Sequence, residues 1–258
     1  MSLNKRIADL VSFCLGILLI GVMIQWAGNL KDNALIFPGV QEISKAFLRL
    51  IREESTWLMM EGTLVRLVQS MVLATGIGIT LGMLQGMNRF LRHLLNPLMV
   101  FLRSMPMIIL IFIFIVVVSR EHRPFIPVMA STLVLIPMIS EATCEGCRRI
   151  DRELIDVYRM NSRFNLRVLV RVYLPLMSGY LKQAYVSAVG MGVKLAVSTE
   201  YMVGISDTLG NAVQSSRDAV DYQDIYAYAL IMILMVILVS EVPLALLRWY
   251  DRRKERKA

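Results

Sequence analysis

The sequence is dominated by apolar runs that are long enough to cross a lipid bilayer and are separated by short charged segments. A membrane-spanning helix needs about 20 mostly apolar residues. Hydrophobic residues make up 56% of the chain, against roughly 45–50% in a soluble domain. We therefore expect an all-α, polytopic membrane protein that forms one transmembrane domain over residues 1–258. Six spans are predicted, at about residues 11–27, 62–86, 94–119, 125–143, 180–205 and 225–249.

Lysines and arginines concentrate in the segments that this layout places on one side of the membrane. They include Lys5 and Arg6, the loop 88–93, the segment between the fourth and fifth spans, and the C-terminal tail. Because cytoplasmic loops carry an excess of Lys and Arg, both termini are predicted to be cytoplasmic. The net charge of +8 is then expected to set topology and to contact anionic lipid rather than nucleic acid.

Two further patterns predict helix packing. After Pro38-Gly39, apolar residues fall at helical spacing and predict an amphipathic helix on the outer surface: Val40, Ile43, Phe47, Leu50 and Ile51. In the second span, Gly78, Gly82 and Gly86 lie four residues apart, which allows another helix to approach closely. The alternative is that these glycines reflect the ordinary tolerance of membrane helices for glycine.

The longest charge-rich segment, 145–175, lies between the fourth and fifth spans and carries seven arginines. Its periodicity predicts two short helices on the cytoplasmic face, joined at Asn161-Ser162. A soluble partner that grips this loop would transmit movement into the flanking spans. The alternative is an amphipathic loop whose arginines bind lipid phosphates.

This segment resembles the cytoplasmic signature of permease subunits of binding-protein-dependent ABC importers. That signature is a Glu-Ala-Ala triplet, three residues, Gly, nine residues, and Ile-x-Leu-Pro. The matching positions are Asp156-Val157-Tyr158, Ser162 and Val172-Tyr173-Leu174-Pro175, with the spacing intact and only Leu174 and Pro175 identical. The nitrate/sulfonate/taurine branch is similar in further places: Glu145-Gly146, Asp151, Leu154, Phe37-Pro38, Glu200 and Leu209-Gly210.

The resemblance implies a coupling helix seated on a cytoplasmic ABC ATPase dimer. The residues expected to couple to the ATPase are Asp156, Val157, Tyr158, Arg159, Ser162, Arg163, Leu174 and Pro175. It also implies a second permease copy, expected to form a homodimer, and an extracytoplasmic solute-binding protein at the bacterial inner membrane. The solute implied is an anion of the nitrate, sulfonate or taurine type, or a vitamin precursor.

The chain itself is not expected to be an enzyme or to hold a cofactor. It contains no GxxxxGK[ST] phosphate loop, so ATP and Mg²⁺ are expected on the ATPase subunit. Cys144 and Cys147 lie near Glu141 and Glu145, but no histidine is nearby, and we predict no metal site. The competing hypotheses are a membrane scaffold or sensor that recruits a partner through the basic loop, and an integral membrane enzyme.

Three ionisable residues inside predicted spans are candidates for the solute pathway: Arg103, Lys194 and Glu200. Charged groups in a membrane are costly and usually functional. Two cations facing a pathway would favour an anionic solute. The alternative is internal pairing, of Lys194 with Glu200 or of Arg103 with Glu141.

Overall fold

The computed structural model describes residues 38–150 and 168–255, and every regular element in these ranges is a helix. The predicted first span, 11–27, lies outside the described residues. So do six of the coupling candidates: Asp156, Val157, Tyr158, Arg159, Ser162 and Arg163.

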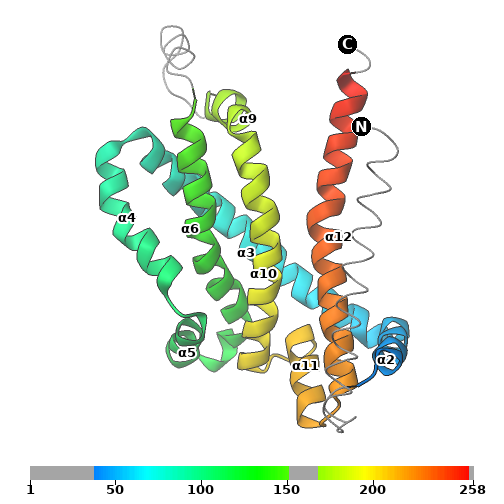
Figure 1. The fold of residues 1–258 in the computed structure, drawn as a ribbon. Coiled ribbons are helices and arrows are strands. Elements are labelled where there is room, and N and C mark those ends of the chain that lie inside the picture. The colour runs from blue at the N-terminus through cyan, green and yellow to red at the C-terminus, as the bar shows by residue number, and fades with distance from the viewer. Residues whose placement is uncertain (1–37, 151–167, 256–258) are drawn as a thin grey trace.

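The helices form an upright group that one long helix crosses. In chain order the elements are α2 Val40–Arg52, α3 Glu54–Met87, α4 Arg89–Ser104, α5 Met107–Val117, the 3₁₀-helix η1 Arg120–Phe125, α6 Ile126–Arg148, the π-helix η2 Leu169–Tyr173, α9 Leu174–Leu176, α10 Ser178–Val203, α11 Leu209–Asp218 and α12 Tyr222–Glu255. Helices α4, α6, α10 and α12 stand side by side, and α3 crosses behind them obliquely (Figure 1). Helices α2, α5 and α11 gather at the end opposite α9 (Figure 1).

Three described stretches are long and apolar enough to cross a membrane by length and composition. They are α3, the η1–α6 stretch Arg120–Arg148, and Tyr222–Ser240 of α12. The pair α4 and α5 adds a fourth if it forms one broken span. Helix α10 is long enough but too polar to pass the same test. The count of six spans therefore stays a prediction.

The predicted third span, 94–119, is not one continuous helix. It is divided into α4 and α5, which are bent by 94° at the break. Met105 has an extended backbone and Pro106 follows it. Proline disfavours helical geometry in the residue before it, which ends α4 here. This elbow changes the expected straight crossing into a broken or re-entrant one.

The amphipathic helix predicted after Pro38-Gly39 is confirmed as α2. Ile43, Ala46 and Leu50 are buried on its inner face, and the helix packs against α12. Arg49 forms an ion pair with Asp224 near the start of α12. The segment 206–224, between the fifth and sixth predicted spans, is not a plain loop, because it contains the helix α11.

The close helix approach predicted from the three glycines is confirmed at the contact of α3 with α6. A Cβ atom at Gly82 would lie 2.4 Å from the carbonyl oxygen of Ser140, and one at Gly86 would lie 2.7 Å from Cβ of Cys147. Gly78 faces Ile139 in the same way, at 2.9 Å. Side chains at these positions would push the two backbones apart, so the glycines set the distance between α3 and α6.

Candidate functional site

Both flanks of the predicted coupling loop are anchored to the membrane helices. Met177, just after α9, is fully buried and belongs to a cluster with Met83, Cys147 and Tyr173. A Cβ atom on Gly146 of α6 would lie 3.1 Å from the side chain of Met177. The chain on the C-terminal side of residues 151–167 is therefore packed directly against α3 and α6, and Ile150 on the other side packs against the same cluster.

Two of the predicted coupling residues, Leu174 and Pro175, lie in the described part of the chain. They form α9, where Pro175 occupies the first turn and is exposed, while Leu174 is partly buried. Proline is tolerated there because its missing N–H would have no helical partner. Their contact with an ATPase stays a prediction.

The basic residues at the C-terminal end of α6 are partly neutralised. Arg149 donates through Nε to Glu145 at 2.9 Å, and Arg148 lies 3.6 Å from the same carboxylate. The hydrogen bond to Glu145 raises the pKa of the Arg149 guanidinium. Glu145 thus holds two of the seven arginines of the segment beside α6.

Glu200 of α10 is a fully buried carboxylate that ties three helices together. Its carboxylate accepts a hydrogen bond from the Thr63 hydroxyl of α3 at 2.9 Å, and Gly210 of α11 lies close enough to donate its N–H at 3.4 Å. Arg66 of α3 lies 3.4 Å away as the ionic partner. A Cβ atom on Gly210 would lie 2.5 Å from Cβ of Glu200. The Leu209-Gly210 turn is therefore held directly over this carboxylate.

The predicted alternative pairing of Lys194 with Glu200 is wrong. The carboxylate is satisfied from α3 and α11, and Lys194 lies on the exposed side of α10. Among the described residues, Lys194 forms no ion pair. The sequence gives no sign that Arg66 is the partner of Glu200, because residues 134 positions apart in the chain meet only through the crossing of α3 and α10.

Arg103 does pair with Glu141, as the alternative for that residue predicted. Arg103 Nη1 lies 2.7 Å from Glu141 Oε2, which joins the end of α4 to α6 just before the elbow. The side chains are nevertheless 59% and 67% exposed. The two charges therefore neutralise each other, and both side chains remain accessible from the exposed surface of α4 and α6.

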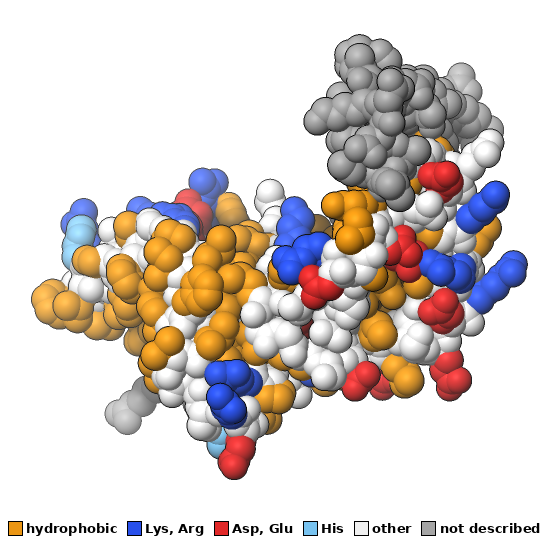
Figure 2. All heavy atoms as spheres, turned by 90° about the horizontal axis from the view of Figure 1, so that it is seen from below, with side chains coloured by type: hydrophobic (Ala, Val, Ile, Leu, Met, Phe, Trp, Pro, Cys, Tyr) orange, Lys and Arg blue, Asp and Glu red, His pale blue; other side chains and the backbone are white. Residues whose placement is uncertain are grey.

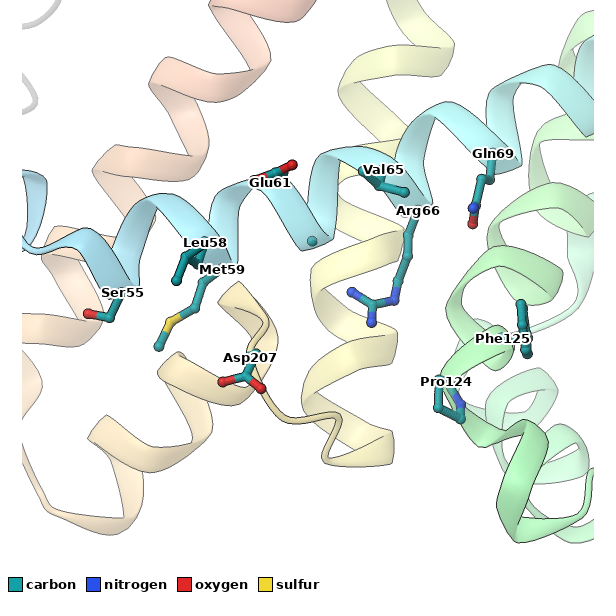
Figure 3. Close-up of a pocket in the computed structure, with 11 residues that line it drawn as sticks. Ser55, Leu58, Met59, Glu61, Val65, Arg66, Gln69, Pro124, Phe125 and Asp207 are labelled. Atoms are coloured by element: carbon teal, nitrogen blue, oxygen red, sulfur yellow. The ribbon is translucent and has the colours of Figure 1, made fainter.

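A cavity of about 700 Å³ lies beside the first half of α3, and Figure 3 shows the side chains that line it. Its wall comes from the first half of α3, the end of η1 and the turn before α11. The charged residues that line it are Glu61, Arg66 and Asp207. Since Arg66 already faces Glu200, the two remaining carboxylates leave the cavity with no excess of positive charge. Asp207 has a φ of 56°, in the left-handed region, so the turn over the cavity is tightly constrained.

The cysteines show no arrangement that suggests metal binding. Cys144 is partly buried and Cys147 is buried, and both are thiols. Within the ranges 38–150 and 168–255, no group of three His, Cys, Asp or Glu side chains is placed to hold a metal ion.

The helices and these polar positions define a polytopic α-helical membrane protein. Residues 75–256 match the family model of the binding-protein-dependent transport system inner membrane component, and the chain belongs to this family of ABC transporter permeases.

Several relatives are known by name. The bicarbonate transport system permease protein CmpB of Synechococcus elongatus is 29% identical over 158 residues, which cover 60% of this chain and 56% of CmpB. The match thus spans just over half the length of that relative. A probable ABC transporter permease of Brucella melitensis biotype 1 is 23% identical over 218 residues, covering 84% of this chain and 85% of the relative.

The fold is similar to a chain of the methionine ABC transporter MetNI in inward-facing conformations. The TM-score is 0.58 at 18% sequence identity, and the match covers 76% of this chain and 97% of that one. At this identity the likeness concerns the fold alone.

Proposed function

We propose that the chain is the membrane subunit of an ATP-driven importer that moves a small solute into the cytoplasm by alternating access. Membership of the permease family supports this function and disfavours the scaffold hypothesis. ATP and Mg²⁺ would be bound by a separate cytoplasmic ATPase dimer. An extracytoplasmic binding protein would deliver the solute, and a second copy of this permease would complete the pathway.

The observation that carries the proposal is the anchoring of the loop flanks. Met177 and Tyr173 pack into α3 and α6 through the cluster with Met83 and Cys147. Packed protein interiors are stiff. A displacement of residues 151–167 by an ATPase would therefore also move the ends of α6 and α10 to which these flanks are packed. Such a transmission is what alternating access requires.

The orientation proposed for the chain is that of the positive-inside rule. The end that carries α9 faces the cytoplasm, with both termini on the same side, and the end that carries α2, α11 and η1 faces outward. Figure 2 views the outer end: charged side chains gather mainly on its right, and hydrophobic ones cover much of its left. The charged part is the proposed docking area for the solute-binding protein.

The solute proposed is a small anion of the nitrate, sulfonate or taurine type, or a vitamin precursor. One similar permease is named for bicarbonate, another small anion. Lys194, exposed on a membrane helix without a partner carboxylate among the described residues, supports the choice of an anion.

Co-purification with the candidate ATPase tests this function. Asp156→Arg combined with Arg163→Glu should abolish retention of the ATPase if the loop is the coupling contact. A matched control, Lys45→Glu combined with Glu54→Arg, reverses two exposed charges at the outer end and should leave retention unchanged. If the wild-type chain retains no ATPase, the importer proposal fails. The scaffold hypothesis, in which the basic loop recruits another partner, is then the one to test.

A further inference from the structure

The uncovered face of α10 is polar along most of its length. The exposed residues on one stripe of this helix are Gln183, Ser187, Met191, Lys194 and Ser198. Their spacing of four, four, three and four residues places them on a single face. Only Met191 among them is apolar, and Lys194 lies about nine residues from the outer end, roughly 13 Å along the helix.

Helices α5 and α12 expose a different surface. In the part of α12 whose side chains are described, the exposed large hydrophobic residues are Leu230, Ile233, Leu234, Ile237 and Leu238, and on α5 they include Ile108, Phe112, Ile113 and Val116. Such faces suit hydrocarbon. A lysine and two serines on a bare helix face do not, because charged groups are expensive in the bilayer interior. Contact with lipid therefore does not account for the stripe on α10.

The stripe lies on the side of α10 that points away from α3. Gly192 contacts α3, since a Cβ atom there would lie 2.7 Å from Leu67, and Glu200 meets Thr63 of α3. Lys194 is two residues from Gly192, about 200° around the helix. It therefore faces the opposite direction.

The same argument applies to α6. Ser140 and Thr143 pack against Gly82 of α3, whereas Glu141 is exposed and paired with Arg103. Helices α6 and α10 stand side by side in front of α3 (Figure 1), and each leaves a charged side chain exposed, Glu141 on α6 and Lys194 on α10. Glu141 is compensated by Arg103, whereas Lys194 has no ion-pair partner among the described residues.

We propose that the polar stripe of α10 forms part of the wall of a water-filled solute pathway, and that Lys194 makes the pathway selective for anions. The proposal rests on the permease function proposed above and deepens it by assigning the face and the charge. The occupant is a hydrated anionic solute in transit. Lys194 attracts it, and Ser187 and Ser198, about one to two turns away on the same stripe, offer hydroxyls to its oxygens.

Accessibility to water-soluble thiol reagents tests the wall. Ser187→Cys and Ser198→Cys, in the full chain assembled with its ATPase, should react with methanethiosulfonate reagents. Leu234→Cys and Ile237→Cys on the exposed face of α12 are matched controls and should react at least tenfold more slowly, because the reagents need a hydrated thiolate. Reaction of the parent chain, which has three cysteines, is subtracted. If the α10 positions are as unreactive as the α12 positions, the face is covered by lipid or by another chain and the proposal is overturned.

The charge assignment has its own readout. At Ser198→Cys, the ratio of the reaction rates with the negatively charged ethylsulfonate reagent and the positively charged trimethylammonium reagent should fall by about fivefold when Lys194→Gln is added, since one unit charge lies about one turn away. Lys194→Arg should preserve the ratio. Lys182→Gln, 16 residues from the probe and roughly 24 Å along the helix, is the matched control and should not change it.

These outcomes are separable from those of the permease function. An unchanged ratio in Lys194→Gln overturns the anion selectivity even when the ATPase is retained. Loss of the ATPase from the wild-type complex instead overturns the importer proposal, and the labelling pattern of the chain alone then reports only whether the face is hydrated.

Discussion

At the scale of single residues, the molecule separates buried charges that hold it together from exposed charges that are available for function. Glu200 has no exposed surface and three polar neighbours. Lys194, six residues earlier on the same helix, is exposed and has no ion-pair partner in the described ranges. Within about one and a half turns, α10 thus carries a buried structural charge, Glu200, and an exposed charge, Lys194. Substitutions at the two positions should have different consequences.

Glu200→Ala should destabilise the protein strongly. The change leaves Arg66, the Thr63 hydroxyl and the Gly210 N–H without their acceptor in a buried site, a loss of about 3–5 kcal/mol for a broken buried pair. Thermal unfolding in detergent measures it. Glu61→Gln, an exposed change on the facing part of α3, is the control and should alter the melting temperature little. Equal melting temperatures for the two variants would contradict the role assigned to Glu200.

Arg103 and Glu141 should behave as an exchangeable pair. Arg103→Glu places two carboxylates together at the elbow, and Glu141→Arg places two guanidiniums there, so each single change should reduce solute-stimulated ATPase activity. The double exchange restores opposite charges and should recover most of the loss. Because both side chains are more than half exposed, the stability of the pair itself should be at most about 1 kcal/mol. No recovery in the double variant would show that the two residues act independently.

At the scale of elements, the contact of α3 with α6 is set by glycine. Gly82→Ala should destabilise the protein by about 1–3 kcal/mol, because the new methyl group would lie 2.4 Å from the Ser140 carbonyl oxygen and the backbones must separate. Gly76→Ala on the same helix meets nothing within 4 Å and should be neutral or slightly stabilising, since alanine is the better helix former. Thermal unfolding of both variants measures the difference, and a reversed order would contradict the packing.

The elements also show what sequence periodicity can and cannot predict. The amphipathic pattern of α2 and the spacing of Gly78, Gly82 and Gly86 are local, and both predictions hold in the structure. At Met105-Pro106 the sequence contains a proline, which can end a helix, but the 94° angle between α4 and α5 depends on tertiary packing and cannot be predicted from it. The partner of Glu200 was mispredicted, since its nearest cation in sequence is Lys194 whereas the crossing helices bring Arg66 to it. The cavity beside Asp207 could not be predicted from the sequence, because residues from three separate elements form it.

At the scale of the whole molecule, the two ends are joined by rigid helices that cross the layer. The Glu200 site lies where α10 meets α11, and the Met177 cluster lies where α10 begins. A movement imposed at the start of α10 would therefore reach the Glu200 site through one helix of 26 residues. This geometry suits a permease whose inner loop is driven by a partner and whose outer end receives a solute.

Met177→Ala should uncouple the inner loop from the helices. Met177 is fully buried against Gly146 and Cys147, so its truncation leaves a cavity that costs about 2–5 kcal/mol and loosens the junction of α9 with α6. In the proposed complex with an ATPase and a solute-binding protein, ATPase binding should persist while stimulation of ATP hydrolysis by the loaded binding protein falls several-fold. Leu176→Ala, on the exposed neighbouring residue, is the matched control and should retain stimulation. Because the loop itself is intact in both variants, equal stimulation would mean that force from the ATPase enters the membrane domain somewhere other than this cluster.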